Sequence, residues 1–137
     1  MALPGWITNT SEIGVGNRYN ANWGTTQIAE LSSTANANYT KVDNLNGGTY
    51  AVRFDYACRD DAPSLASMAI DIYWNFVFLL NINCPAVNDF AIHTQSFILE
   101  AVAGNNYFSL VEVGVEDGLG MTIDNVEIYE ADDGNWV

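Results

Sequence analysis

Apolar and polar residues alternate along most of this chain. In the stretch Thr49–Cys58 every second side chain from Tyr50 to Tyr56 is large and apolar, and Met68–Trp74 repeats the pattern. A period of two is typical of β-strands that bury one face, whereas the 3.6-residue period of a capped amphipathic helix is almost absent. The pattern therefore predicts an all-β protein.

Eight alternating runs, each bounded by Gly, Asn, Asp, Ser or Pro, are expected to be strands. Their regular spacing, without helices between them, favours a sandwich or barrel of about eight or nine strands over a parallel sheet. The runs are Gln27–Ser32, Tyr39–Leu45, Thr49–Cys58, Met68–Trp74, Phe76–Ile82, Ser96–Val102, Tyr107–Val113 and Thr122–Tyr129.

Two short turns separate neighbouring strands. Asn46-Gly47-Gly48 and Gly104-Asn105-Asn106 both consist of residues that tolerate positive φ. We expect each to close a β-hairpin between the strands on either side of it.

The strand faces opposite the apolar ones carry polar groups. In the runs Thr49–Cys58 and Met68–Trp74 these are Arg53, Asp55, Asp71 and Tyr73. We expect these residues to form a polar face with one aromatic ring, which is either simply solvated or a binding surface.

The last predicted strand contains an acid at a position that the pattern places inward. Side chains alternate along a strand, so Asp124 is expected on the same side as Val126 and Ile128. An ionised group buried without partners costs several kcal/mol or more. Either a cation or backbone N–H groups at the strand end must therefore accompany Asp124.

The charge of the chain restricts its partners. Its 137 residues include 17 Asp and Glu but only 4 Lys and Arg, which gives a formal net charge of -13. Such a field repels nucleic acids and anionic membranes and attracts divalent cations, of which calcium prefers the oxygen ligands this sequence has in excess. No apolar run is long enough to span a bilayer, so we expect no membrane insertion.

The length fits a single domain, 1–137, whose acidic tail begins at about residue 130. The N-terminus has no basic segment followed by an apolar one, so no signal peptide is predicted. Cys58 and Cys84 are compatible either with one disulfide or with two buried free thiols, because their spacing matches no metal or redox motif.

Four short motifs follow one another along nearly the whole chain. They are Pro4-Gly5-Trp6 followed by Glu12-Ile13, Ala29-Glu30-Leu31-Ser32-Ser33, Gly47-Gly48-Thr49-Tyr50 leading to Phe54-Asp55-Tyr56-Ala57-Cys58-Arg59, and Gly118-Leu119-Gly120 before Ile123-Asp124-Asn125-Val126. In this order they resemble the galactose-binding-like jelly-roll superfamily. They are similar in particular to plant cell-wall domains of unknown function and to modules of large bacterial calcium-dependent surface adhesins.

The resemblance implies a two-sheet antiparallel jelly-roll sandwich, extracellular or cell-surface placement, a structural calcium ion and, in many members, carbohydrate binding. Carried over by position, Glu12, Glu30 and Asp124 are the acids that would bind the calcium. The chain departs from the family at two places. The family usually has Glu-Leu-Asp where this chain has Glu30-Leu31-Ser32, and a glycine after Trp-Asn where this chain has Phe76.

Trp74 shares a face with apolar residues and is expected in the core, whereas Trp23, between Asn22 and Gly24, is expected to be exposed and able to stack on a sugar ring. His93 is the single histidine, and no nucleophile or zinc motif surrounds it, so we do not expect an enzyme.

Our hypothesis is therefore a non-catalytic extracellular module that holds a structural calcium ion and binds carbohydrate or a cell-surface glycan. The alternative is a structural, spacer or interaction domain of a surface adhesin or fibre, in contact with neighbouring domains and without a ligand of its own. The candidate sugar contacts, expected on loops, are Tyr19, Asn22, Trp23, Arg59 and Asp60.

Overall fold

Ten β-strands and one short 3-10 helix make up the part of the chain that the structure describes. This computed structural model describes residues 6–8, 12–15, 21–24, 27–30, 38–59, 68–84, 91–113 and 121–131, with the backbone alone for 6–8, 12–15, 21, 27 and 30. Within these ranges no helix is long and apolar enough to cross a membrane. The elements are β1 (Trp6–Thr8), β2 (Glu12–Val15), η2 (Ala21–Trp23), β3 (Gln27–Glu30), β4 (Asn38–Leu45), β5 (Gly48–Ala57), β6 (Ala69–Trp74), β7 (Val77–Asn83), β8 (His93–Ala101), β9 (Gly104–Glu112) and β10 (Thr122–Glu130).

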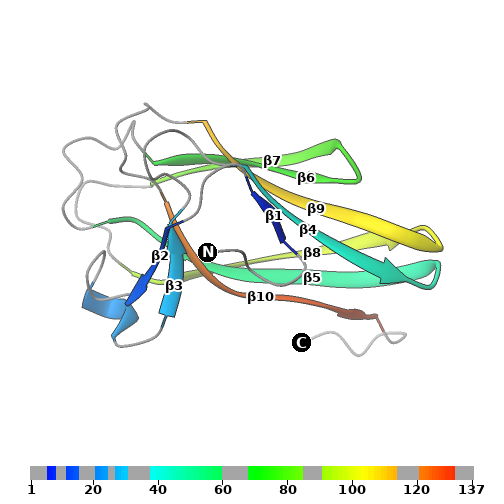
Figure 1. The fold of residues 1–137 in the computed structure, drawn as a ribbon, viewed down its shortest axis with the longest axis horizontal. Coiled ribbons are helices and arrows are strands. Elements are labelled where there is room, and N and C mark those ends of the chain that lie inside the picture. Colours follow the sequence, from blue (N-terminus) through cyan, green and yellow to red (C-terminus); the bar gives the residue numbers. More distant parts are fainter. Residues whose placement is uncertain are drawn as a thin grey trace.

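The strands form two five-stranded antiparallel sheets that face each other (Figure 1). The first sheet has the strand order β1-β4-β9-β6-β7, and the second has the order β2-β3-β10-β5-β8. Some strands that follow one another in the chain, such as β4 and β5, lie in different sheets. The architecture is the predicted jelly-roll sandwich, in which two stacked sheets bury their inner faces.

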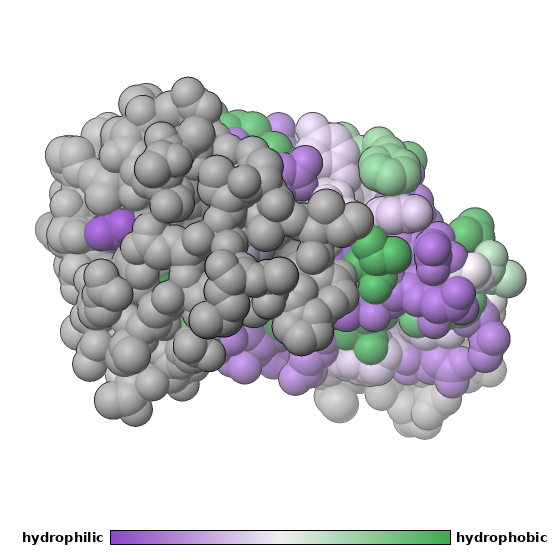
Figure 2. Space-filling view, in the orientation of Figure 1, coloured by the Kyte–Doolittle hydropathy of each residue, from purple (hydrophilic) through white to green (hydrophobic). Residues whose placement is uncertain are grey.

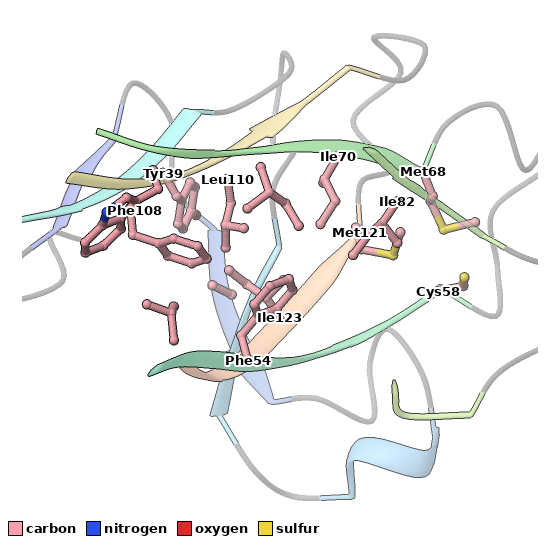
Figure 3. Close-up of a cluster of buried hydrophobic side chains, with 14 of the residues drawn as sticks. Tyr39, Phe54, Cys58, Met68, Ile70, Ile82, Phe108, Leu110, Met121 and Ile123 are labelled. Atoms are coloured by element: carbon pink, nitrogen blue, oxygen red, sulfur yellow. The ribbon is translucent and has the colours of Figure 1, made fainter. Parts of the chain in front are cut away.

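The core lies between the two sheets (Figure 3). Ile70, Phe108 and Leu110 of the first sheet are fully buried and face Phe54 of the second. The rings of Phe54 and Phe108 approach each other with their centroids 6.0 Å apart. Burying side chains of this size contributes roughly 1.5–3 kcal/mol each. The apolar faces predicted for β5 and β6 are therefore the buried ones, and Trp74 lies in the core as expected.

All eight predicted runs are strands, with ends that differ by a few residues from those expected. Two further strands, β1 and β2, have only three and four residues. Runs this short show too little alternation to be recognised in the sequence.

The two predicted hairpins are wrong. The turn after β4 and the turn after β8 each lead from one sheet to the other, because β4 pairs with β9 and β5 pairs with β8. Gly48 and Gly104, with φ of 131° and 109°, begin the strands that follow these crossings. The turn residues permit either route, and placing consecutive strands in facing sheets buries their apolar faces against each other.

A hairpin does occur between β6 and β7, which pair directly. Its turn residues, Asn75 and Phe76, have φ of 47° and 68°. Positive φ at both central residues characterises the turn type whose twist matches that of paired strands.

Cys58 and Cys84 form a disulfide with their Cα atoms 5.9 Å apart. Cys58 follows β5 and Cys84 follows β7, so the bond joins the second sheet to the first. Both cysteines are buried. The sequence had left free thiols as an equal alternative, because nothing local to either cysteine shows that strands from different sheets end side by side.

Candidate functional site

The outer face of the first sheet carries four aromatic side chains, Tyr73, Phe76, Phe78 and Tyr107, which we call the aromatic face. Tyr73, Phe78 and Tyr107 belong to β6, β7 and β9, which are adjacent strands, and Phe76 lies in the β6–β7 turn. The strand neighbours of both tyrosines are buried, so alternation directs the tyrosines to the outside. Phe76 and Phe78 are 72% and 53% exposed, and the tyrosines are half-buried.

The four rings form two contacting pairs. Tyr73 and Phe78 have their centroids 5.8 Å apart in an edge-to-face arrangement at 74°, and Phe76 and Tyr107 have theirs 5.0 Å apart at 32°. In each pair a half-buried tyrosine supports a more exposed phenylalanine. Such contacts contribute about 0.5–1.5 kcal/mol beyond burial, so the exposed rings are held in place before any ligand arrives.

Hydroxyl and amide groups flank the rings on the same face. Thr40 and Ser109 lie opposite each other with their Oγ atoms 2.9 Å apart, and Ser109 lies opposite Tyr73. On the other side the Nδ2 of Asn81 donates to the Oδ1 of Asp71 at 2.8 Å. Asp71 is the one carboxylate, and there is no basic group, among the side chains that the described strands place on this face.

Asn75 fixes the β6–β7 turn to β9. Its backbone N–H donates to the carbonyl oxygen of Tyr107 at 2.8 Å, and the N–H of Tyr107 donates back to the Oδ1 of Asn75 at 2.8 Å. The Nδ2 of Asn75 donates to the Oδ1 of Asn106 at 3.0 Å. Asn106 is itself 1% exposed and bonds to the backbone of Val102 and Gly104. The turn is therefore tied to the neighbouring strand by a connected network.

Phe76 adopts a backbone conformation that favours glycine. Its φ of 68° costs an L-residue about 1–2 kcal/mol, and glycine is the residue usual at this position in the superfamily that the sequence resembles. Strain of this kind persists where the surrounding structure enforces it, and it concentrates at functional positions. Here the strain places an exposed ring beside Tyr107.

The outer face of the second sheet carries a pair of acids, Asp55 and Asp124, which lie opposite each other on β5 and β10. Thr94 Oγ1 and Asn125 Nδ2 donate to the two oxygens of Asp55 at 2.6 and 2.9 Å. Burial raises the pKa of Asp124, the negative charge of Asp55 raises it further, and a hydrogen bond from the backbone of Asn125 acts in the opposite direction.

The prediction that Asp124 faces the core with Val126 and Ile128 is wrong. The pairing of β10 with β5 shifts between Asp124 and Glu127, and Asn125 has a positive φ of 54°. This bulge reverses the alternation, so Ile123 is buried at 2% while Asp124 lies half-buried on the outside. Val126 and Ile128, beyond the bulge, do pack against the core.

The predicted polar face of Arg53, Asp55, Asp71 and Tyr73 is also divided. Arg53 and Asp55 lie on β5 in the second sheet, whereas Asp71 and Tyr73 lie on β6 in the first. The outer faces of two stacked sheets point in opposite directions, so these residues belong to two different surfaces of the molecule.

The backbone register brings the three predicted calcium ligands into one region of the second sheet. Glu12 lies opposite Glu30, and Glu30 lies opposite Thr122, two residues before Asp124. The side chains of the two glutamates are outside the described part of the structure. No group of three or more His, Cys, Asp or Glu side chains suited to a metal occurs among the residues that are described.

The expected exposure of Trp23 is wrong. Its side chain is 6% exposed, packs with Ile28 and Ala57, and donates from Nε1 to the Oγ1 of Thr122 at 2.8 Å. The 3-10 turn of η2 folds the indole onto the outer face of the second sheet. The neighbouring residues Asn22 and Gly24 suggested an exposed loop, and they do not indicate this long-range packing.

The remaining predicted sugar contacts are not brought together by the described residues. Asn22 is exposed, and Arg59 is half-buried with its backbone N–H donating to the sulfur of Met68 at 3.1 Å. Tyr19 and Asp60 lie outside the described residues.

Sequence reasoning found one member of the aromatic face, Tyr73, and missed its grouping with the others. The signal was present as Asn75-Phe76, an aromatic where a tight turn favours glycine. The pairing of β6 with β9 that adds Tyr107 joins segments more than thirty residues apart and has no local signature.

The described strands define the class of the protein by fold, as a two-sheet antiparallel jelly-roll sandwich. A family 35 carbohydrate binding module from Clostridium thermocellum is similar, with a TM-score of 0.64 at 16% identity and coverage of 92% of both chains. The family 35 module from Paenibacillus barcinonensis gives a TM-score of 0.58 at 18% identity, covering 93% of this chain and 94% of that one.

The C-terminal family 6 module of a marine laminarinase from Zobellia galactanivorans is also similar. Its TM-score is 0.57 at 12% identity, with 90% of this chain and 91% of that chain covered. The chain matches no protein-family model and no curated protein. At these identities the comparisons establish the fold.

Proposed function

We propose that this protein is a non-catalytic carbohydrate-binding module whose ligand stacks on the aromatic face. The observation that carries the proposal is the pair of ring contacts, Tyr73 with Phe78 and Phe76 with Tyr107, on one sheet face. The C–H groups on one side of a pyranose are weakly positive and apolar, and they pack on the negative face of an aromatic ring. Solved structures of similar fold are named as carbohydrate binding modules, which supports the same reading.

The two ring pairs suit a ligand of more than one sugar unit. Tyr73 and Tyr107 are diagonal neighbours on β6 and β9, since Tyr73 lies opposite Ser109. Diagonal neighbours in an antiparallel pair are about 7–8 Å apart. This separation is longer than the centroid distances within the two ring pairs, 5.8 and 5.0 Å. A chain crossing β9, β6 and β7 would contact both pairs at once.

The polar groups beside the rings suit an uncharged sugar. Hydroxyls and amides such as Thr40, Ser109 and Asn81 both donate and accept, as sugar hydroxyls do. The absence of a basic side chain among the described residues of this face, together with the net charge of -13, disfavours an anionic polymer.

A binding role explains this face better than hydrolysis. Glycoside hydrolysis generally needs two carboxyl groups on either side of the scissile bond. Asp71 is the one carboxylate that the described strands bring to the aromatic face, and Asn81 donates to it.

The proposal includes a structural calcium ion bound by Glu12, Glu30 and Asp124, and an extracellular location. The register that places Glu12 opposite Glu30 supports the first, because calcium takes several carboxylate oxygens. The Cys58–Cys84 disulfide supports the second, because disulfides persist in oxidising compartments.

Calorimetric titration with neutral oligosaccharides, after a glycan array has selected them, tests the sugar site. Tyr73→Ala should weaken binding roughly tenfold, which corresponds to about 1.4 kcal/mol. Tyr129→Ala is the matched control, since Tyr129 is an exposed tyrosine on the second sheet and should leave binding unchanged. An array without any signal for the wild type would instead favour the spacer alternative.

A further inference from the structure

The two sides of the sandwich differ in their edge strands. On one side the sheets end in β1 and β2, which have three and four residues. On the other side they end in β7 and β8, which have seven and nine. An edge strand presents unpaired backbone N–H and C=O groups, and proteins commonly avoid unwanted pairing by keeping such strands short. The β1–β2 side follows that rule and the β7–β8 side does not.

The long edges also lack most of the other protective features. β7 (VFLLNIN) contains no Asp, Glu, Lys, Arg or His, and β8 contains Glu100 and His93. Neither contains proline or lysine, which usually discourage edge pairing. One bulge occurs in β7, where the pairing with β6 shifts opposite Ile72 and Tyr73.

Exposed hydrophobic side chains concentrate on the same side. The five most exposed large ones among the described residues lie on β7, on β8 or in the turns beside them, and Figure 2 shows hydrophobic atoms at the β6–β7 tip. They are Phe76, Val77, Phe78, Ile98 and Val102, with exposures of 72, 64, 53, 62 and 58%.

The two edges face outward together. Trp74, next to β7 in the first sheet, donates from its Nε1 to the carbonyl oxygen of Glu100 on β8 at 2.9 Å. The disulfide between Cys58 and Cys84 links the same two parts of the sheets at the other end. The side of the sandwich therefore presents two stacked strands, one from each sheet.

We infer that the β7–β8 side is a self-association surface whose occupant is a second copy of this chain. A single extended peptide would pair with one of the two edges and leave the other exposed. A second sandwich presents two stacked edges at the same spacing, and a two-fold axis would pair β7 with β7 and β8 with β8. Both sheets would then continue across the interface.

The distribution of charge selects this side among the possible contacts between two copies. Each molecule carries a net charge of -13, so two copies repel each other in most orientations. Contact through β7 and β8 brings together the edges that hold one acid, Glu100, between them. The remaining repulsion is long-range and is screened by salt, so the dimer should become more stable as the ionic strength rises.

Sedimentation equilibrium of the wild-type protein tests this inference without any glycan, so its outcome is independent of the proposed function. We expect a monomer–dimer equilibrium that shifts towards dimer between about 0.01 M and about 1 M NaCl, as the screening length falls from roughly 30 Å to roughly 3 Å. A protein that stays monomeric at every concentration and salt level, or that forms open-ended aggregates instead of a dimer, overturns the inference.

Lysine substitutions locate the surface. Val77→Lys and Ile98→Lys each place a charge on one edge and should abolish the dimer. Val113→Lys is the control, because Val113 is an exposed valine (45%) outside both edges; it changes the net charge by the same amount and should retain the dimer. Melting curves verify that each variant is folded. If an edge variant does not fold, loss on dilution of hydrogen-exchange protection in β7 and β8 of the wild type provides the second test. Equal dimerisation in all three variants, or unchanged protection, contradicts the assignment.

Discussion

The indole Nε1 of Trp23 donates to the Oγ1 of Thr122, 2.8 Å away and 99 residues later in the chain. The same hydroxyl donates to the carbonyl oxygen of Ala57 at 2.7 Å. Thr122 thereby connects η2, β10 and β5 through one buried oxygen, since it is fully buried and Trp23 nearly so.

Thr122→Val should therefore destabilise the protein without altering sugar binding. Valine has a similar shape but leaves the buried indole N–H and the Ala57 carbonyl without this partner, which costs about 1–3 kcal/mol for each group. Urea unfolding measures the loss of free energy. Trp23→Phe should also destabilise. A variant of Trp23 with unchanged stability and weakened sugar affinity would return this residue to the ligand site.

Phe76→Gly should be more stable than Phe76→Ala, and a poorer binder than the wild type. Glycine relieves the strain at φ 68°, about 1–2 kcal/mol, while the exposed ring that Tyr107 supports is lost. Phe76→Ala is the matched control, because alanine loses the ring but keeps the strain. Thermal unfolding should rank glycine above alanine, and calorimetry should find both variants weak. Equal stability of the two would mean that the turn is not strained.

Asp124→Asn should raise the melting temperature at neutral pH in the presence of a chelator. Burial raises the pKa of folded Asp124 above its ordinary value of 3.8, so the folded state holds the proton more tightly than the unfolded state. The stabilising contribution of this proton is complete below the unfolded value and is lost as the pH rises through the folded value. The difference in melting temperature between Asp124→Asn and the wild type should therefore develop as the pH rises through the folded pKa of Asp124, and it should vanish below the unfolded pKa.

Calcium should reverse this result. A bound cation stabilises the folded protein by RT ln(1 + [L]/Kd), and asparagine at position 124 supplies one charge fewer for it. Wild type should gain stability on addition of calcium, and Asp124→Asn should gain much less. A wild-type melting temperature that does not respond to calcium removes the metal from the proposed function while leaving the sugar site untouched.

Replacing Cys58 and Cys84 together by serine should cost about 2–4 kcal/mol of unfolding free energy. The bond closes a loop of 26 residues, and in the chain-entropy description it restricts the unfolded state. Denaturant titration of the double variant against the oxidised wild type measures the difference. The wild type treated with reductant should match the double variant if the loss comes from the bond.

The strands were predictable because alternation is a local property. The alternation of Tyr50, Val52 and Phe54 predicts a strand with one buried face, and this prediction does not depend on which strands pair with it. These residues are buried as expected. The assignment of strands to sheets was not predictable in this way. A glycine-rich turn such as that before Gly48 has the same composition whether the chain returns beside itself or crosses to the other sheet.

The candidate sites illustrate the same limit. Asp124 was placed on the wrong face because one residue with positive φ, Asn125, reverses the alternation. Asparagine tolerates positive φ but does not require it, so the sequence does not predict the bulge. Trp23 was expected to be exposed because its partner Thr122 is 99 residues away. Tyr73 and Tyr107 share a face only because β6 pairs with β9. Each of these features depends on long-range pairing that a single sequence does not reveal.

The β6–β7 hairpin supplies three of the four rings of the aromatic face within six consecutive residues, from Tyr73 to Phe78. Its anchor, Asn75, makes two hydrogen bonds with the backbone of Tyr107 and one with Asn106, and none of them involves the rings. Randomising Tyr73, Phe76 and Phe78 while keeping Asn75 would therefore leave the attachment to β9 in place. A library of this size is small enough for exhaustive screening, which makes the hairpin a practical starting point for evolving new ligand preferences on this scaffold.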